Sequence, residues 1–168
     1  ALLEYLKIKP DYSFSKFSLP PGRCSLLKGI KNTTIIDSSY NATPDGVKSI
    51  LGTFNQYPSN KKWAVLGDMI ELGVEEQEEH KKLADVINSL KLSKVILIGP
   101  RLSKYTYPKL NHNITMKQLN NETIDRFLMP KDALSYILTH LRGGESVLFK
   151  GARFLEGIIE HLLLDKND

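Results

Sequence analysis

The amino-acid sequence predicts an α/β fold: a three-layer, Rossmann-like domain whose sheet of about five to six strands is mostly parallel. Apolar segments of strand length alternate along the chain with segments whose apolar residues recur at helical spacing, the pattern of repeated βα units. The chain has 168 residues, of which 41% are hydrophobic, enough to bury one core. No repeat or low-complexity tract interrupts the alternation.

The first elements have clear start and stop signals. A strand is expected over about 33–36, and Thr43-Pro44-Asp45 then provides an N-cap, a first-turn proline and a first-turn acid for a helix. Pro58 ends this helix before a second strand at about 62–66. The helix has an apolar stripe that suits packing on a sheet, formed by Val47, Ile50, Leu51 and Phe54.

The second half continues the βα rhythm with one weak stretch. The remaining expected elements are a helix over 74–90, a strand over 95–98 closed by Gly99-Pro100, a short strand near 114–116, a weak helix around 122–128, a helix over 130–141, a strand over 146–149 and a helix over 155–163. Residues 101–128 have the least distinct pattern.

The first 22 residues differ in composition from the remainder. Residues 1–6 read as the end of a helix, and the prolines and Gly22 within 7–22 favour an extended connector over a packed element. We therefore predict that 1–22 is the tail of a preceding domain with a linker, and that 23–168 is the domain itself.

Composition narrows the function classes. A single cysteine, Cys24, excludes an internal disulfide framework and favours a cytoplasmic setting, and the histidines are too scattered for a zinc cluster, so no metal site is predicted. The net charge is +4, but basic residues alternate with acids, which argues against nucleic-acid binding. No apolar run is long enough for a membrane span.

Three loops directly follow predicted strands, at 37–44, 67–73 and 150–153. In an open parallel sheet, ligands bind in the crevice at the carboxyl ends of the strands, so these loops are expected to meet at one site.

The first loop feeds the N-terminus of a helix, which attracts anions, and its Tyr40 suits stacking on a base. Thr43 alone reads as a cap, whereas Tyr40-Asn41 exceeds what capping needs, and this favours ligand contact over capping alone. Arg23, at the start of the domain, is either a free surface arginine or a phosphate or ribose contact across a hinge.

The other two loops carry charge. Asp68, between Gly67 and Gly73, is placed to hold an amine or a hydrated metal, although an ordinary loop with solvated acids explains it equally well. Lys150 and Arg153 put two cations at the start of a helix, where the dipole disfavours each by about 0.3–1 kcal/mol, so a bound carboxylate or phosphate is expected. The alternative is that both extend into solvent. His80 is expected to be packed or capping.

Four motifs in order resemble the carboxy-terminal domain of the Mur ligases, most closely the D-alanyl-D-alanine-adding (MurF-type) enzymes. They are Gly22-Arg23, the segment from Ile36 to Pro44, the segment from Leu66 to Gly73 followed by His80, and the segment from Lys150 to Arg153. The resemblance covers 22–164, and the agreement of four motifs in order makes it specific.

The resemblance implies an ATP-dependent amide ligase of peptidoglycan precursor synthesis. In that family ATP phosphorylates the carboxylate of a UDP-muramyl tripeptide, and the amine of D-alanyl-D-alanine attacks the acyl phosphate. The missing N-terminal and central domains would be partners, with Mg²⁺ held mainly by the central one. By this likeness Arg23, Asp37, Tyr40 and Asn41 would face ATP. The residues that would line the dipeptide and acyl-phosphate side are Asp68, Glu71, Lys150 and Arg153.

The sequence departs from the family pattern at three positions. Ser38 stands where the family has a second acid, Thr43 where it has an asparagine, and Ala152 where it has a serine. The first change removes a carboxylate expected near the ribose. The chain also has no phosphate-binding loop of the Walker type, so catalysis by this segment alone is not expected. The alternative is a stand-alone, non-catalytic α/β binding or regulatory module derived from this fold.

Overall fold

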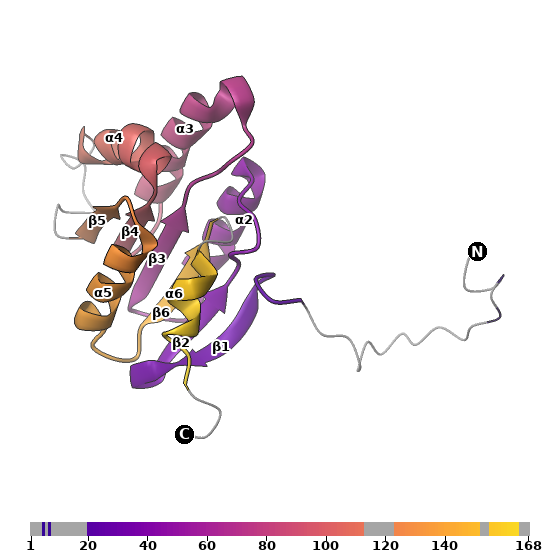
Figure 1. Ribbon diagram of the computed structural model, residues 1–168, viewed down its shortest axis with the longest axis vertical. Coiled ribbons are helices and arrows are strands. Elements are labelled where there is room, and N and C mark those ends of the chain that lie inside the picture. The colour runs from indigo at the N-terminus through magenta and orange to yellow at the C-terminus, as the bar shows by residue number, and fades with distance from the viewer. Residues whose placement is uncertain (1–4, 6, 8–19, 113–122, 152–154, 165–168) are drawn as a thin grey trace.

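A six-stranded sheet in the order β1-β2-β6-β3-β4-β5 forms the centre of the computed structural model, which describes residues 5, 7, 20–112, 123–151 and 155–164 (Figure 1). The strands are β1 (Ser25–Gly29), β2 (Thr33–Asp37), β3 (Lys62–Gly67), β4 (Lys94–Ile98), β5 (Ile124–Phe127) and β6 (Ser146–Lys150). Only the β1–β2 pair is antiparallel among these strands of the described residues. The predicted α/β fold with a mostly parallel sheet is therefore confirmed.

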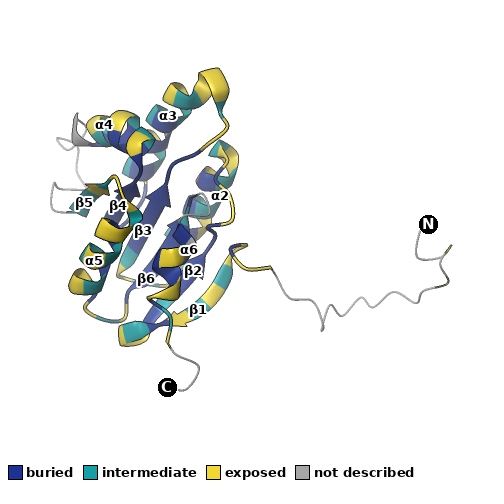
Figure 2. Cartoon of the chain, in the orientation of Figure 1, coloured by how far each residue is buried: buried dark blue, intermediate teal, exposed yellow. Residues whose placement is uncertain are grey.

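Helices cover both faces of this sheet. The helices are α2 (Pro44–Asn55), α3 (Glu76–Asn88), α4 (Tyr107–His112), α5 (Pro130–His140) and α6 (Glu156–Glu160). The first three pack on one face and the last two on the other, giving two apolar core layers with the sheet between them (Figures 1 and 2). Right-handed crossovers explain this division, because the chain advances from β2 to β5 in one direction and returns to β6 in the other.

Local signals explain the elements that were predicted well. Thr43 Oγ1 accepts a hydrogen bond from the Gly46 N–H at 3.3 Å, so α2 begins with the expected cap and Pro44 in its first turn. The central parallel strands β3, β4 and β6 are almost wholly buried (Figure 2). Since helices cover both of their faces, these strands read as continuous apolar runs in the sequence.

Two strands differ from the sequence-based expectation. The weak helix expected around 122–128 is wrong, because Ile124–Phe127 forms β5 and pairs in parallel with β4. Ile124 packs into one core layer and Phe127 into the other, which is the alternation of a strand. Edge strand β1 was not predicted, because its side chains are only partly buried and its sequence follows a proline-rich stretch.

Several helix boundaries also differ. A helix that begins at Pro100 continues through a π-helical turn, η3 (Leu102–Thr106), into α4, where the sequence suggested no element. A short 3-10 turn, η2 (Gly73–Glu75), precedes α3, and α6 is shorter than the expected 155–163. The strand expected near 114–116 lies outside the described residues.

Candidate active site

The three predicted loops meet at the carboxyl edge of the sheet because β6 lies between β2 and β3. The Ser38 N–H donates to the Phe149 carbonyl at 2.9 Å, which joins the first loop to β6. Gly151 lies against Gly67: a Cβ on Gly151 would stand 2.8 Å from the Gly67 Cα. The absence of a side chain at 151 therefore lets the ends of β3 and β6 touch. Ala152 and Arg153 lie outside the described residues.

Lys150 occupies the middle of this edge. Its side chain is half-buried, and Nζ donates to Ser38 Oγ at 3.4 Å. An ideal Cβ on Gly46 would lie 3.9 Å from the same nitrogen, so the ammonium stands beside the first turn of α2. No carboxylate of the described part of the chain pairs with it. Burial lowers the pKa of Lys150, and Cys24 opposes this effect. The arrangement suits a bound anion.

Arg23 and Tyr40 form an exposed pair at the same edge of the sheet. Tyr40 follows Ser38, the residue that accepts the hydrogen bond from Lys150, by two positions. The Arg23 guanidinium carbon lies 4.1 Å from the centre of the Tyr40 ring, a cation–π contact, and Tyr40 is 39% exposed. Asn41 is also exposed, and its Oδ1 accepts from the Ala42 N–H at 2.8 Å. A planar cation, an aromatic ring and an amide thus stand together at the surface, where a nucleotide could contact them.

Asp37 lies beneath this pair and is only 6% exposed. Its Oδ2 accepts from the Gly22 N–H at 3.1 Å, and its Oδ1 accepts from the Ser39 N–H at 3.0 Å and the Ser39 hydroxyl at 2.6 Å. Both carboxylate oxygens are therefore bonded to the protein. The structure brings Asp37 together with Arg23 and Tyr40, but with its carboxylate turned inward.

Asp68 also points into the protein. It is 2% exposed, and its two oxygens accept from the backbone N–H groups of Arg101 at 3.1 Å and Leu102 at 2.9 Å. The Arg101 guanidinium lies 3.6 Å away. Asp68 thus caps the helix that follows β4, a role that its position in a glycine-bracketed loop did not reveal. Gly99-Pro100 was the available sequence signal for that helix start.

The tip of the second loop is held from below by His80. The fully buried imidazole accepts from the Met69 N–H at 3.3 Å through Nε2, and Nδ1 lies 2.7 Å from the Glu76 carbonyl oxygen, so Nδ1 carries the proton. His80 is therefore packed, as expected. Glu71, at the tip, is exposed and has a left-handed backbone, with φ of 63°.

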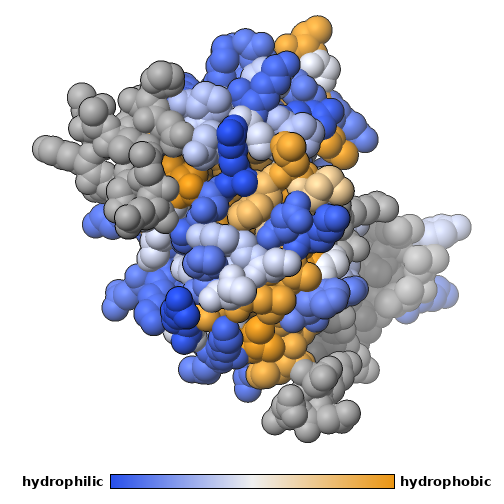
Figure 3. Space-filling view, turned by 60° about the vertical axis from the view of Figure 1, so that its left-hand side comes forward, coloured by the Kyte–Doolittle hydropathy of each residue, from blue (hydrophilic) through white to orange (hydrophobic). Residues whose placement is uncertain are grey.

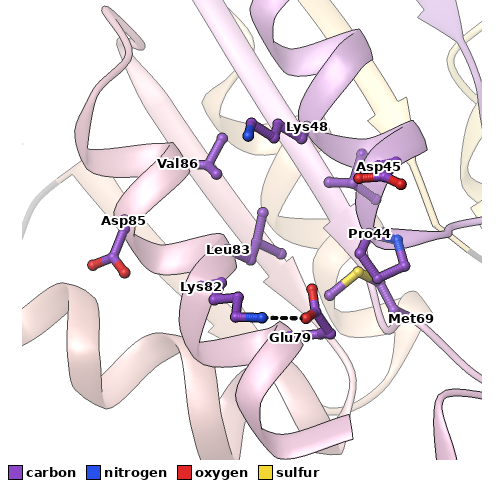
Figure 4. A pocket seen from close by; sticks show the side chains of 10 residues that line it. Pro44, Asp45, Lys48, Met69, Glu79, Lys82, Leu83, Asp85 and Val86 are labelled. Carbon is purple, nitrogen blue, oxygen red and sulfur yellow. Dashed lines mark hydrogen bonds and ion pairs between the residues drawn. The ribbon is translucent and has the colours of Figure 1, made fainter. Parts of the chain in front are cut away.

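A groove of about 440 Å³ runs between α2 and α3 next to this loop (Figure 4). Buried Val47, Met69 and Leu83 form its floor, while Lys48 projects from α2 at its rim. Met69 connects the groove to the 67–73 loop. The carboxyl edge thus combines a lysine that has no carboxylate partner among the described residues with a nearby groove that has an apolar floor and a charged rim.

The described residues contain no group of three or more His, Cys, Asp or Glu side chains placed to hold a metal ion. Nor is any helix among them long and apolar enough to cross a bilayer.

A family model described as "Mur ligase, glutamate ligase domain" matches residues 22–153. The chain belongs to the Mur ligase family. Two curated relatives are named UDP-N-acetylmuramoyl-tripeptide--D-alanyl-D-alanine ligase. The one from Rickettsia prowazekii is 30% identical over 88% of this chain, and the one from Bacillus subtilis is 31% identical over 84%. The chain spans about 30% of the length of each.

Solved Mur ligases share the fold. A MurF ligase from Thermotoga maritima, crystallised with ADP, matches 95% of this chain with a TM-score of 0.70 and 24% identity, over 35% of its own length. MurF from Acinetobacter baumannii matches 85% of this chain with a TM-score of 0.69 and 25% identity, over 30% of its own length. The predicted family resemblance is therefore confirmed.

Proposed function

We propose that this chain is the carboxy-terminal domain of an ATP-dependent amide ligase that adds D-alanyl-D-alanine to a UDP-muramyl tripeptide in peptidoglycan precursor synthesis, in the cytoplasm. The proposal rests on the environment of Lys150. This lysine is half-buried, pairs with no carboxylate in the described residues, and lies where the three loops of the carboxyl edge meet. The names of the relatives support the substrate assignment.

Arg23, Tyr40 and Asn41 would contact ATP from this side, with Asp37 behind them. The residues fit a nucleotide because an exposed ring and a planar cation lie together within 4.1 Å. ATP would supply activation of the tripeptide carboxylate as an acyl phosphate. This domain would contribute binding and exclusion of water, which place the incoming amine close to the activated carbonyl.

Lys150 and Arg153 would face the acyl phosphate and the carboxylate of the dipeptide, because both of these groups are anions that cationic side chains bind. Glu71, exposed at the tip of its loop, would lie on the dipeptide side. Asp68 would act on that side by holding the loop in place, given that its carboxylate is bonded to backbone N–H groups. By the likeness to the Mur ligases, Mg²⁺ would be held mainly by the central domain.

The preceding N-terminal and central domains would be the partners of this edge. Large apolar side chains are exposed in the loops that follow β2, β3 and β5: Tyr40, Ile70, Val74, Leu128 and Met129. Figure 3 shows several apolar patches among hydrophilic side chains on one face of the molecule. Exposed apolar groups at one edge favour contact with another protein surface.

A non-catalytic binding or regulatory module remains the second candidate, favoured by Ser38 and Ala152. The sequence upstream of the chain discriminates between the two, since a Walker-type loop there supports the ligase.

The direct test is phosphate release by the full-length polypeptide with ATP, a UDP-muramyl tripeptide and D-alanyl-D-alanine. We expect activity that needs all three, no turnover by the 168-residue chain alone, and a loss of about 10²–10³-fold in kcat for Lys150→Met. A matched control is Lys131→Met, which removes an exposed lysine from the first turn of α5, on the other face of the sheet from the groove, and should leave kcat unchanged. Full activity of Lys150→Met would contradict the assignment of Lys150.

A further inference from the structure

We infer that Asp37 is a positioning residue that fastens the end of the interdomain linker to the sheet edge, and that it acts on the nucleotide through Arg23 and Tyr40. The nucleotide part of this inference rests on the proposed function. The anchoring part concerns only the chain described above.

The contacts of Asp37 leave it little capacity to bind a ligand directly. Its carboxylate accepts from the N–H of Gly22, 15 residues earlier, and from both donors of Ser39. The side chain is 6% exposed. A buried carboxylate that accepts three hydrogen bonds has used most of its acceptor capacity, and removing it would leave the Gly22 and Ser39 donors without their partner.

The backbone conformation and close packing of Gly22 suit this contact with Asp37. It is buried, its φ is 74°, and a Cβ there would lie 2.9 Å from the Tyr40 nitrogen. Its carbonyl in turn accepts from the Tyr40 N–H at 3.1 Å. Gly22 is thus bonded on one side to Asp37 and on the other to Tyr40.

This clamp determines where Arg23 lies. Arg23 directly follows Gly22, and its guanidinium stacks on the ring of Tyr40. Asp37 therefore fixes both the backbone that presents Arg23 and the loop that presents Tyr40. The linker enters the domain at the carboxyl edge, and any rotation between domains must occur on the N-terminal side of Gly22.

Amide hydrogen exchange on the 168-residue chain tests the anchor without requiring ligase activity. In Asp37→Ala the Gly22 and Tyr40 amides should exchange at least about 10-fold faster, because their protection depends on the clamp. Ser39→Ala is the matched control: it removes the hydroxyl bond to Asp37 but leaves the bond to Gly22, so Gly22 exchange should change by less than about 3-fold. Unchanged protection of β3 amides such as Val65 reports that the variants are folded.

Gly22→Ala is an independent test of the anchor. Its Cβ would push Tyr40 away, so the Tyr40 amide should exchange faster, as in Asp37→Ala. Unchanged exchange at Gly22 in folded Asp37→Ala would overturn the anchor.

The positioning role is tested by steady-state kinetics of the full-length polypeptide. Asp37→Ala should raise the KM for ATP by about 10-fold or more with a smaller change in kcat, because Arg23 and Tyr40 remain present but are less well placed. An unchanged KM in an active enzyme would overturn this role. If the polypeptide has no ligase activity while Gly22 exchange responds as expected, the proposed function fails and the anchor stands.

Discussion

Replacing Lys150 with methionine is expected to stabilise the domain, although the same change should impair the ligase. The Lys150 ammonium lies at the first turn of α2, where an ideal Cβ on Gly46 would be 3.9 Å from Nζ. A cation at the positive end of a helix costs about 0.3–1 kcal/mol, and methionine removes that charge while keeping the apolar stem packed. In a domain of this size 1 kcal/mol corresponds to about 2–4 °C in Tm.

The pH dependence has a definite sign. Burial lowers the pKa of Lys150 in the folded state, so between that lowered pKa and the ordinary value of about 10.4 the unfolded chain binds more protons. Stability of the unmodified protein therefore rises with pH across this window, whereas Lys150→Met lacks this contribution. The advantage of the variant should shrink as pH approaches about 10.4.

Urea unfolding at pH 7 and at intervals up to pH 10 measures both effects, with equal m-values required for the comparison. Lys48→Met, at an exposed site on α2, is the control for loss of a lysine charge and should stay within about 0.5 kcal/mol. The reasoning is refuted if Lys150→Met is less stable than the unmodified protein at pH 7, or if its advantage grows with pH.

Three further substitutions probe the same edge. Gly151→Ala should cost about 1–3 kcal/mol in unfolding free energy, because the new Cβ would stand 2.8 Å from the Gly67 Cα; a cost below 0.5 kcal/mol by urea unfolding would contradict the close contact. Asp68→Ala should cost about 1–2 kcal/mol through loss of the helix cap, and faster exchange of the Leu102 amide should accompany it; unchanged Leu102 exchange would argue against capping. Ser38→Asp should raise the pKa of Lys150, since a carboxylate would stand beside its ammonium, and an unchanged dependence of stability on pH between 7 and 10 would contradict that pairing.

The architecture was readable from the sequence where local signals and long-range packing agree. Strands covered on both faces have continuous apolar runs, and Thr43-Pro44 correctly predicted the start of α2. β5 was not predicted because it has only four residues, too few for their pattern to distinguish a strand from a helix. β1 escaped because an edge strand with one exposed face has no such run.

The meeting of the three loops also followed from the sequence, because parallel strands end at one edge. The direction of each side chain did not. Asp68 accepts from the backbone of Arg101, 33 residues later, and Asp37 accepts from the backbone of Gly22, 15 residues earlier. Such partners depend on how loops approach one another in space, which neither periodicity nor motif spacing determines.

The central place of β6 has a consequence for how the site is made. Among the described residues β6 is the last strand in sequence order, yet it is the strand that hydrogen-bonds to both β2 and β3. During synthesis from the N-terminus, the described β1–β2 pair and β3–β4–β5 unit therefore share no strand pairing until β6 leaves the ribosome. The 37–44 loop and the 67–73 loop are two separate surfaces before that moment. A nascent chain thus lacks the composite site until β6 can pair, and the insertion of this one strand both joins the two parts of the sheet and brings Lys150 to its centre.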